Sequence, residues 1–355
     1  MTIYFLINEG EDIPYLHHVV VLAEGFQKLG IRTFANTNYW KESPGSDYLL
    51  QVDASVLPED CDIIITSSTV DFSTLNEKQV SAFVKSRKKT IFIDGQDGMK
   101  TSGYRKPFVQ STLVLKCHYN RKYKYPRNFM PWQFGLTQRI ISSVSPVENR
   151  EEKILVNFRV NHPSRAYAKK KLLPILKEYL EVENTYNPKD EPGNDDPVEM
   201  NYRRQAPTRH HASYYKNLST SLACLCIGGS FKKSIYSGSH TIFRGLSWLD
   251  RSDGLLPFID FDRIVQYDSW RFWESLVAGC CAIHIDLDRY GAELPLNPTN
   301  YEHYLGVDFS DLSLTNDFLQ NHGLDGLKEI GQKGREWVIS NYSPKAVANR
   351  LLEKL

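Results

Sequence analysis

Apolar runs of strand character alternate with helical patterns twice along this chain of 355 residues. In the first unit the pattern predicts strands over residues 3–8, 31–35, 62–66 and 90–94, and helices over 15–29 and 76–85. In the second unit it predicts strands over 153–160, 222–227 and 281–285, and helices over 165–180, 269–278, 324–341 and 344–355. Such alternation is typical of a parallel sheet with helices on both faces. The sequence therefore predicts an α/β protein with two Rossmann-like domains.

The polar segment before residue 153 marks the division between the two units. We assign residues 1–140 to an N-terminal domain, 141–152 to a linker, 153–340 to a C-terminal domain and 341–355 to a terminal helix. Ser343 and Pro344 offer a cap and a first-turn proline for that helix. A length of 355 residues and a hydrophobic fraction of 41% are sufficient for two cores.

Charge and cysteine content narrow the class of partner. The formal net charge of +1 gives no overall attraction to nucleic acid, so an anion site has to be local. The first apolar run is too short for a signal peptide or a membrane span. The six cysteines lack the paired spacing of a zinc site. We expect a reduced, cytoplasmic protein with no metal site and no nucleic-acid partner.

The segment from 268 to 285, DSWRFWESLVAGCCAIHI, carries the most functional information. Asp268 or Ser269 can cap a short helix, Gly279 fits its left-handed exit, and an apolar strand follows. Amide groups at the helix start attract anions, and the Arg271 guanidinium matches a phosphate. Glu274 can accept two hydrogen bonds from a ribose. Together they predict a nucleotide site, the alternative being that Arg271 and Glu274 form a surface pair three residues apart.

This segment resembles the donor site of GT-B glycosyltransferases, in which a helix with a glutamate precedes a small-residue turn and a strand. The exostosin-like variant is most similar, because Ser-x-Arg precedes the acidic residue and the turn is AGC. The resemblance implies two Rossmann-like domains facing a cleft, with the terminal helix packing on the first domain. It also implies that Ser269 and Arg271 face the diphosphate of a UDP- or GDP-sugar and Glu274 its ribose. Many retaining members carry a second glutamate where this chain has Gln266, which favours inversion.

Further donor contacts are predicted where strands of the second unit end. Arg159 and Arg165 follow its first strand and can neutralise a leaving diphosphate, although Arg165 also suits a solvated helix start. Gly228 and Gly229 follow the next strand and permit close approach of backbone N–H groups to a phosphate or a base. A plain tight turn explains the two glycines equally well. The long connection over residues 231–266 suits a lid.

An acceptor is expected at the other unit, in the loops over 8–14, 67–73 and 94–100, because ligands bind beyond the carboxyl ends of parallel strands. Inverting transfer needs a group that takes the proton of the attacking hydroxyl. Asp94 and Asp97 are the candidates, since the glycines beside them allow a turn that exposes both side chains. Asp94 is also a common turn cap. His17 and His18 start the first helix, and we expect them to be structural.

Residues 116–127 mix several cations with tyrosines. Such a composition suits single-stranded nucleic acid, a phosphate-bearing acceptor or peripheral contact with an anionic membrane. A structural or substrate-lining role between the domains is the interpretation that we favour.

The predicted function is transfer of a hexosyl or pentosyl group from a nucleotide sugar to a hydroxyl acceptor such as a glycan. No further cofactor is required by that reaction. Two other functions suit the same pattern: a non-catalytic homologue that binds a sugar or a protein, and a nucleotide-sugar epimerase on the same fold.

Overall fold

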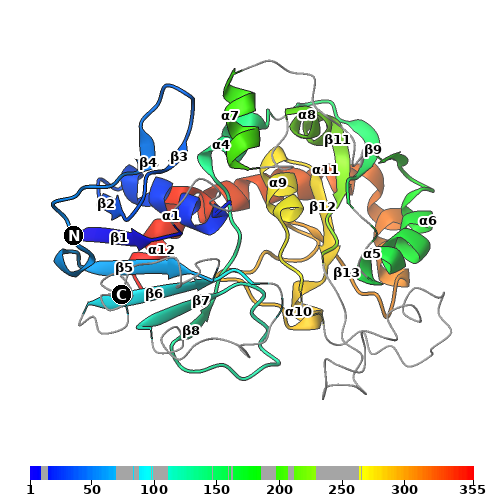
Figure 1. The fold of residues 1–355 in the computed structure, drawn as a ribbon. Helices are drawn as coiled ribbons and strands as arrows, with labels where there is room; N and C mark the ends of the chain where they lie inside the picture. Colours follow the sequence, from blue (N-terminus) through cyan, green and yellow to red (C-terminus); the bar gives the residue numbers. More distant parts are fainter. Residues whose placement is uncertain are drawn as a thin grey trace, which may run out of the picture.

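A computed structural model describes residues 1–8, 15–68, 83, 88–96, 98, 111–145, 147–158, 160, 163–184, 197–206, 212–228, 264 and 266–355. Figure 1 shows two separate parallel sheets, with strands β1, β2 and β5 to β8 on one side of the molecule and β9, β11, β12 and β13 on the other. Both sheets are Rossmann-like, as the alternating pattern predicts. The α/β fold class is confirmed.

The first sheet has six parallel strands in the order β2-β1-β5-β6-β7-β8. Their bounds are β1 (Thr2–Leu6), β2 (Arg32–Ala35), β5 (Ile63–Ser67), β6 (Lys89–Asp94), β7 (Leu113–Lys116) and β8 (Phe129–Pro131). The other elements of this part are α1 (His17–Lys28), the antiparallel pair β3 (Tyr39–Lys41) and β4 (Tyr48–Leu50), η1 (Pro58–Asp60) and α4 (Gln138–Ser143). The inner strands are apolar and buried, as is typical of strands inside a parallel sheet.

The second sheet has five parallel strands in the order β10-β9-β11-β12-β13. Their bounds are β9 (Glu151–Val156), β10 (Glu181–Asn184), β11 (Ser221–Leu225), β12 (Cys281–Ile285) and β13 (Leu305–Val307). The helical elements here are α5 (Pro163–Tyr167), η2 (Ala168–Leu172), α6 (Leu173–Leu176), α7 (Pro197–Gln205), α8 (Ala212–Thr220), α9 (Trp270–Ala278), α10 (Leu287–Tyr290) and α11 (Ser313–Tyr342). The chain order reverses between β9 and β11, and α/β proteins bind ligands beyond the carboxyl ends of strands at such a point.

The last helix, α12 (Pro344–Leu352), lies against α1 of the first unit (Figure 1). The two helices approach closely at Gly25, where a Cβ atom would lie 2.2 Å from the carbonyl oxygen of Pro344. A glycine is therefore required at this crossing. The C-terminal segment thus connects the two halves, while the domain boundaries that we assign stay a proposal.

Several predicted elements differ from the observed ones. The helix predicted over 165–180 ends at Leu176 and contains a π-helical turn at η2, next to Pro174, which has no N–H for a regular helical bond. Strand β9 begins at Glu151, inside the predicted linker. Helix α11 begins at Ser313, and the predicted start near 324 is instead a kink at Gly323 with φ of 57°. The helix predicted over 76–85 lies outside the described residues, except for Phe83.

All six cysteines are buried as free thiols. Within the described part of the chain, no helix combines the length and the apolar character that crossing a bilayer requires.

Candidate functional site

Helix α9 has the predicted start and end. Ser269 is its N-cap residue, and Gly279 ends it with φ of 72°, in the left-handed region. The Ser269 hydroxyl does not cap its own helix; it donates a hydrogen bond to the carbonyl oxygen of Cys226 at 3.2 Å. At the other end, Arg150 donates to the carbonyl of Ala278, and Arg335 to that of Val277. Both ends of α9 are therefore fixed to their surroundings.

Glu274 lies inside the protein, because only 4% of its surface is exposed. The hydroxyl of the buried Tyr215 on α8 donates a hydrogen bond to Glu274 Oε1 at 3.3 Å. A carboxylate at this depth does not belong to a solvated helix face, so the surface-pair alternative is wrong. Among the residues that the structure describes, the half-buried Arg271 guanidinium makes no hydrogen bond or ion pair.

The end of β11 meets two other segments at the point where the strand order reverses. The Ser164 hydroxyl donates to the carbonyl of Gly228 at 2.6 Å, and Arg165 Nε donates to the carbonyl of Ile227 at 3.0 Å. A Cβ atom on Gly228 would lie 2.6 Å from the carbonyl oxygen of Tyr267. Gly228 is therefore required for the close approach of two backbones. The exit of β11, the start of α5 and the approach to α9 form one site, which we call the α9 site.

Three predicted site residues, Arg159, Gly229 and Asp97, lie outside the described residues, as does most of the connection over 231–266. Of the described ones, Arg165, Gly228 and Ser269 meet at the end of β11, and Arg271 and Glu274 lie on α9 directly after Ser269.

The first sheet contacts the α9 site through His118, just after β7. His118 Nδ1 accepts hydrogen bonds from the backbone N–H groups of Tyr267 and Asp268, at 3.3 and 3.2 Å. Asp268 in turn accepts from the Phe134 N–H at 2.7 Å and from Trp273 Nε1 at 2.6 Å. Burial raises the pKa of the Asp268 carboxyl to about 6, although these contacts and His118 oppose the rise. Asp268, predicted as a cap, instead joins the two halves of the molecule.

Asp94 is not exposed by the turn that follows β6, contrary to the prediction. Its side chain and that of Lys116 are both fully buried, and Lys116 Nζ lies 2.6 Å from Asp94 Oδ2. Lys116 also donates to the carbonyl of Gly98 at 2.7 Å, and the Gln96 N–H donates to Asp94 at 3.1 Å. The pair forms because Asp94 and Lys116 are register partners at the ends of β6 and β7. A catalytic role for Asp94 stays a prediction.

The basic stretch over 116–127 begins inside the protein, at Lys116. Further along, Arg121 forms an exposed ion pair with Asp288 at 3.3 Å, and Lys122 donates to the carbonyl of Arg289 at 3.2 Å. Tyr119 and Tyr125 stack with ring centroids 4.1 Å apart. These contacts with the α10 region support a structural role between the two halves. Peripheral membrane contact is untested.

The two neighbouring histidines have different surroundings. His17 is buried and satisfied, with Tyr15 OH at 2.9 Å and the carbonyl of Gly135 at 3.1 Å. His18 is half-buried, with Nε2 3.2 Å from Cys117 Sγ. A Cβ atom on Gly95 would lie 2.8 Å from its ring, so His18 sits at the carboxyl end of β6. Burial lowers the pKa of His18 to about 3, and the nearby His118 contributes to the shift, so the ring is neutral at pH 7. The feature of the sequence that could have indicated these contacts is the pair of adjacent histidines directly after a strand-end loop.

No protein-family model matches the chain, and no curated protein matches it by sequence. The exostosin-like character of residues 268–285 therefore stays a prediction. No group of metal-ligand side chains suited to an ion occurs among the described residues.

Several solved structures are similar in fold. One is AviGT4, a glycosyltransferase involved in avilamycin A biosynthesis. The match covers 100% of this chain and 96% of AviGT4, with a TM-score of 0.54 and 12% sequence identity. An alpha-glucosyltransferase in complex with UDP and a 13-mer DNA matches with 100% and 98% coverage, a TM-score of 0.53 and 10% identity. Anabaena HepE in complex with UDP matches with 100% and 99% coverage, a TM-score of 0.51 and 9% identity. The chain has the fold of these glycosyltransferases, two Rossmann-like sheets in the GT-B arrangement.

Proposed function

We propose that this protein transfers a sugar from a nucleotide-sugar donor, bound at the α9 site, to a hydroxyl acceptor held by the first unit. The observation that carries the proposal is the buried Glu274 on α9, hydrogen-bonded to Tyr215 next to the point where the strand order reverses. A carboxylate has two oxygens that can accept hydrogen bonds from a pair of ribose hydroxyls. UDP is the favoured nucleotide because solved structures of the same fold hold it.

The other residues of the α9 site suit a diphosphate. Arg271 and Ser269 lie in the first turn of a helix whose N–H groups favour negative charge. Arg271 makes no hydrogen bond or ion pair with the described residues, so its guanidinium fork is available to a phosphate. Arg159, Arg165 and the Gly228-Gly229 turn complete the proposed donor contacts.

The acceptor base is assigned to the carboxyl edge of the first sheet. Inversion is favoured because Gln266 stands where many retaining enzymes carry a glutamate. Asp94 and Asp97 keep this role as proposals.

Glu274→Gln is expected to weaken binding of UDP or a UDP-sugar by about 10- to 100-fold, since a charge-assisted hydrogen bond contributes roughly 1.5–3 kcal/mol. Titration calorimetry with UDP measures this directly, without an acceptor. Glu336→Gln, on the exposed side of α11, is the control and should bind as the wild type does. Equal UDP affinity in the Glu274 variant would exclude Glu274 from the donor site.

Arg271→Lys should also lower UDP affinity, by about tenfold, because an ammonium offers a point charge in place of a bidentate fork. The matched control is Arg121→Lys, which makes the same change in an exposed ion pair with Asp288, outside the α9 site. The diagnostic measurement compares UDP with uridine. Loss of affinity for UDP alone assigns Arg271 to the diphosphate, whereas equal losses for both ligands count against that assignment.

A further inference from the structure

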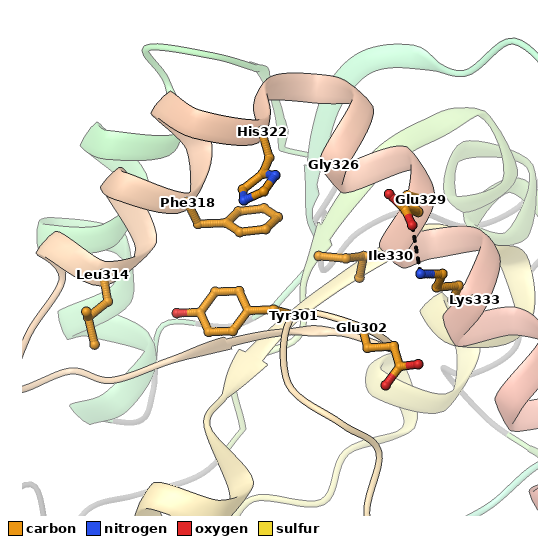
Figure 2. Close-up of a pocket in the computed structure, with 9 residues that line it drawn as sticks. All are labelled: Tyr301, Glu302, Leu314, Phe318, His322, Gly326, Glu329, Ile330 and Lys333. Atoms are coloured by element: carbon orange, nitrogen blue, oxygen red, sulfur yellow. Dashed lines mark ion pairs between the residues drawn. The ribbon is translucent and has the colours of Figure 1, made fainter.

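A pocket of about 490 Å³ lies between α11 and the turn that precedes β13, and none of the α9-site residues lines it. Figure 2 shows its walls: aromatic rings on one side and charged groups on the other. The residues that line it include Tyr301, Glu302, Phe318, His322, Glu329 and Lys333. Its volume is within the range of about 300–1,000 Å³ that small-molecule sites occupy.

The backbone of Tyr301 is held in an unfavourable conformation, with φ of 60°. Its N–H donates to the carbonyl of Tyr304 at 2.9 Å and to Asn300 Oδ1 at 2.8 Å. Asn300 Oδ1 also accepts from the Gly306 N–H at 2.6 Å, which anchors the turn to β13. These contacts fix a ring that is 39% exposed at the pocket wall. Backbone strain of this kind is concentrated at functional sites, which makes the exposed Tyr301 ring a candidate for ligand binding.

The rest of the aromatic side comes from the first part of α11. Phe318 and His322 stack with centroids 4.8 Å apart and planes 27° apart, and Phe318 lies 5.2 Å from the Tyr301 ring. Gly323 breaks the helix there with φ of 57°. In Figure 2, the helix changes direction just after His322, and the hollow opens between its two parts. The kink therefore shapes the pocket.

Polar groups occupy the other side. Glu329 and Lys333 form an exposed ion pair at 2.7 Å, and the exposed Glu302 carboxylate lies below them (Figure 2). Two carboxylates and one ammonium accept and donate hydrogen bonds but carry a net negative charge. This lining disfavours an anionic ligand, and its charged side disfavours a purely apolar one.

We propose that this pocket, the α11 pocket, binds a neutral saccharide at a site separate from the α9 site. A sugar ring presents C–H groups on its faces and hydroxyl groups on its edges. The C–H faces suit the exposed ring of Tyr301, whose π face is negative, while Phe318 packs against that ring and supports it. The hydroxyls can donate to Glu302 and Glu329 and accept from Lys333. The inference does not require catalysis at the α9 site.

The test titrates the full chain with a neutral glucose hexasaccharide and a neutral N-acetylglucosamine hexasaccharide, followed by NMR saturation transfer and calorimetry. Tyr301→Asn removes the ring, and asparagine tolerates the left-handed backbone conformation at this position. Phe318→Ala removes the second ring. We expect each variant to weaken binding of at least one hexasaccharide by about two- to tenfold, the effect of losing one aromatic contact or its support.

Tyr48→Asn is the matched control, since Tyr48 is 38% exposed on β4 and Tyr301 is 39% exposed. It should bind the hexasaccharide as the wild type does. Glu274→Gln should also bind it normally, which separates this site from the proposed donor site. Equal binding in Tyr301→Asn, Phe318→Ala and wild type would overturn the proposal. So would tighter binding of an apolar peptide than of either saccharide, or dimerisation that both ring deletions abolish.

Discussion

Asp94→Asn is expected to lower the free energy of unfolding by about 3–5 kcal/mol, because it leaves the Lys116 ammonium buried without its carboxylate. Both side chains are fully buried, and 2.6 Å separates Lys116 Nζ from Asp94 Oδ2. The Gly98 carbonyl is a second acceptor for Lys116, but it carries no charge to compensate the ammonium. Urea denaturation followed by circular dichroism measures the loss.

The exposed pair of Arg121 and Asp288 provides the control. Asp288→Asn should cost less than about 1 kcal/mol, as exposed ion pairs do. Replacing both members of the buried pair, with Asp94→Asn and Lys116→Met together, should recover much of the lost stability. A loss in Asp94→Asn no larger than that in Asp288→Asn would contradict the prediction.

The same variant bears on catalysis. If Asp94 is the acceptor base, turnover in Asp94→Asn should fall by about 100-fold or more under conditions where the protein is still folded. If Asp94 is structural, turnover per folded molecule should be retained, and Asp97 is the remaining candidate for the base. UDP affinity should be unchanged in both cases, because the donor contacts are assigned to the other unit.

Local patterns were sufficient for the two parallel sheets and for the start and end of α9. The buried strands are continuous apolar runs, and α9 carries its own start and stop signals at Ser269 and Gly279. Short elements such as β10 were missed, because Glu181–Asn184 lies at the sheet edge and has little strand character. Likewise, α10 has only four residues and no periodicity for a pattern to reveal.

Contacts between segments that are far apart in the sequence could not be predicted from local patterns. Lys116 looked like the first cation of a basic, tyrosine-rich stretch, and only the register of β6 with β7 places it opposite Asp94. Asp268 looked like a helix cap, yet its carboxylate accepts the N–H of Phe134, 134 positions earlier in the chain. These roles depend on which strands are neighbours, and no short segment of the sequence carries that information.

Buried ionisable groups act on stability with opposite signs. Burial raises the pKa of Asp268 from 3.8 to about 6 and that of Glu24 from 4.5 to about 8. The contribution of each group to stability is therefore lost as the pH rises from the lower to the higher of its two values. Burial of His284 acts the other way, since it lowers the pKa to about 3. The pH curve of the wild type alone therefore does not isolate any of them.

His284→Asn isolates the histidine contribution. The ring is fully buried, stacked on Phe272 at 4.7 Å, and its Nδ1–H donates to the carbonyl of Cys226 at 3.1 Å. An asparagine amide can replace that donor but cannot titrate. Between the folded pKa of about 3 and the unfolded value of 6.5, the unfolded chain binds the extra proton, so this contribution is complete above 6.5 and is lost as pH falls.

The wild type should therefore exceed His284→Asn in stability by a margin that shrinks by about 2 kcal/mol between pH 6.5 and pH 4.5. Urea denaturation at half-unit pH intervals measures that margin. Phe272→Leu disturbs the same ring stack without changing a titratable group, so its stability difference from the wild type should be the same at every pH. A margin for His284→Asn that is equally independent of pH would mean that His284 accepts its proton as readily in the folded protein as in the unfolded chain.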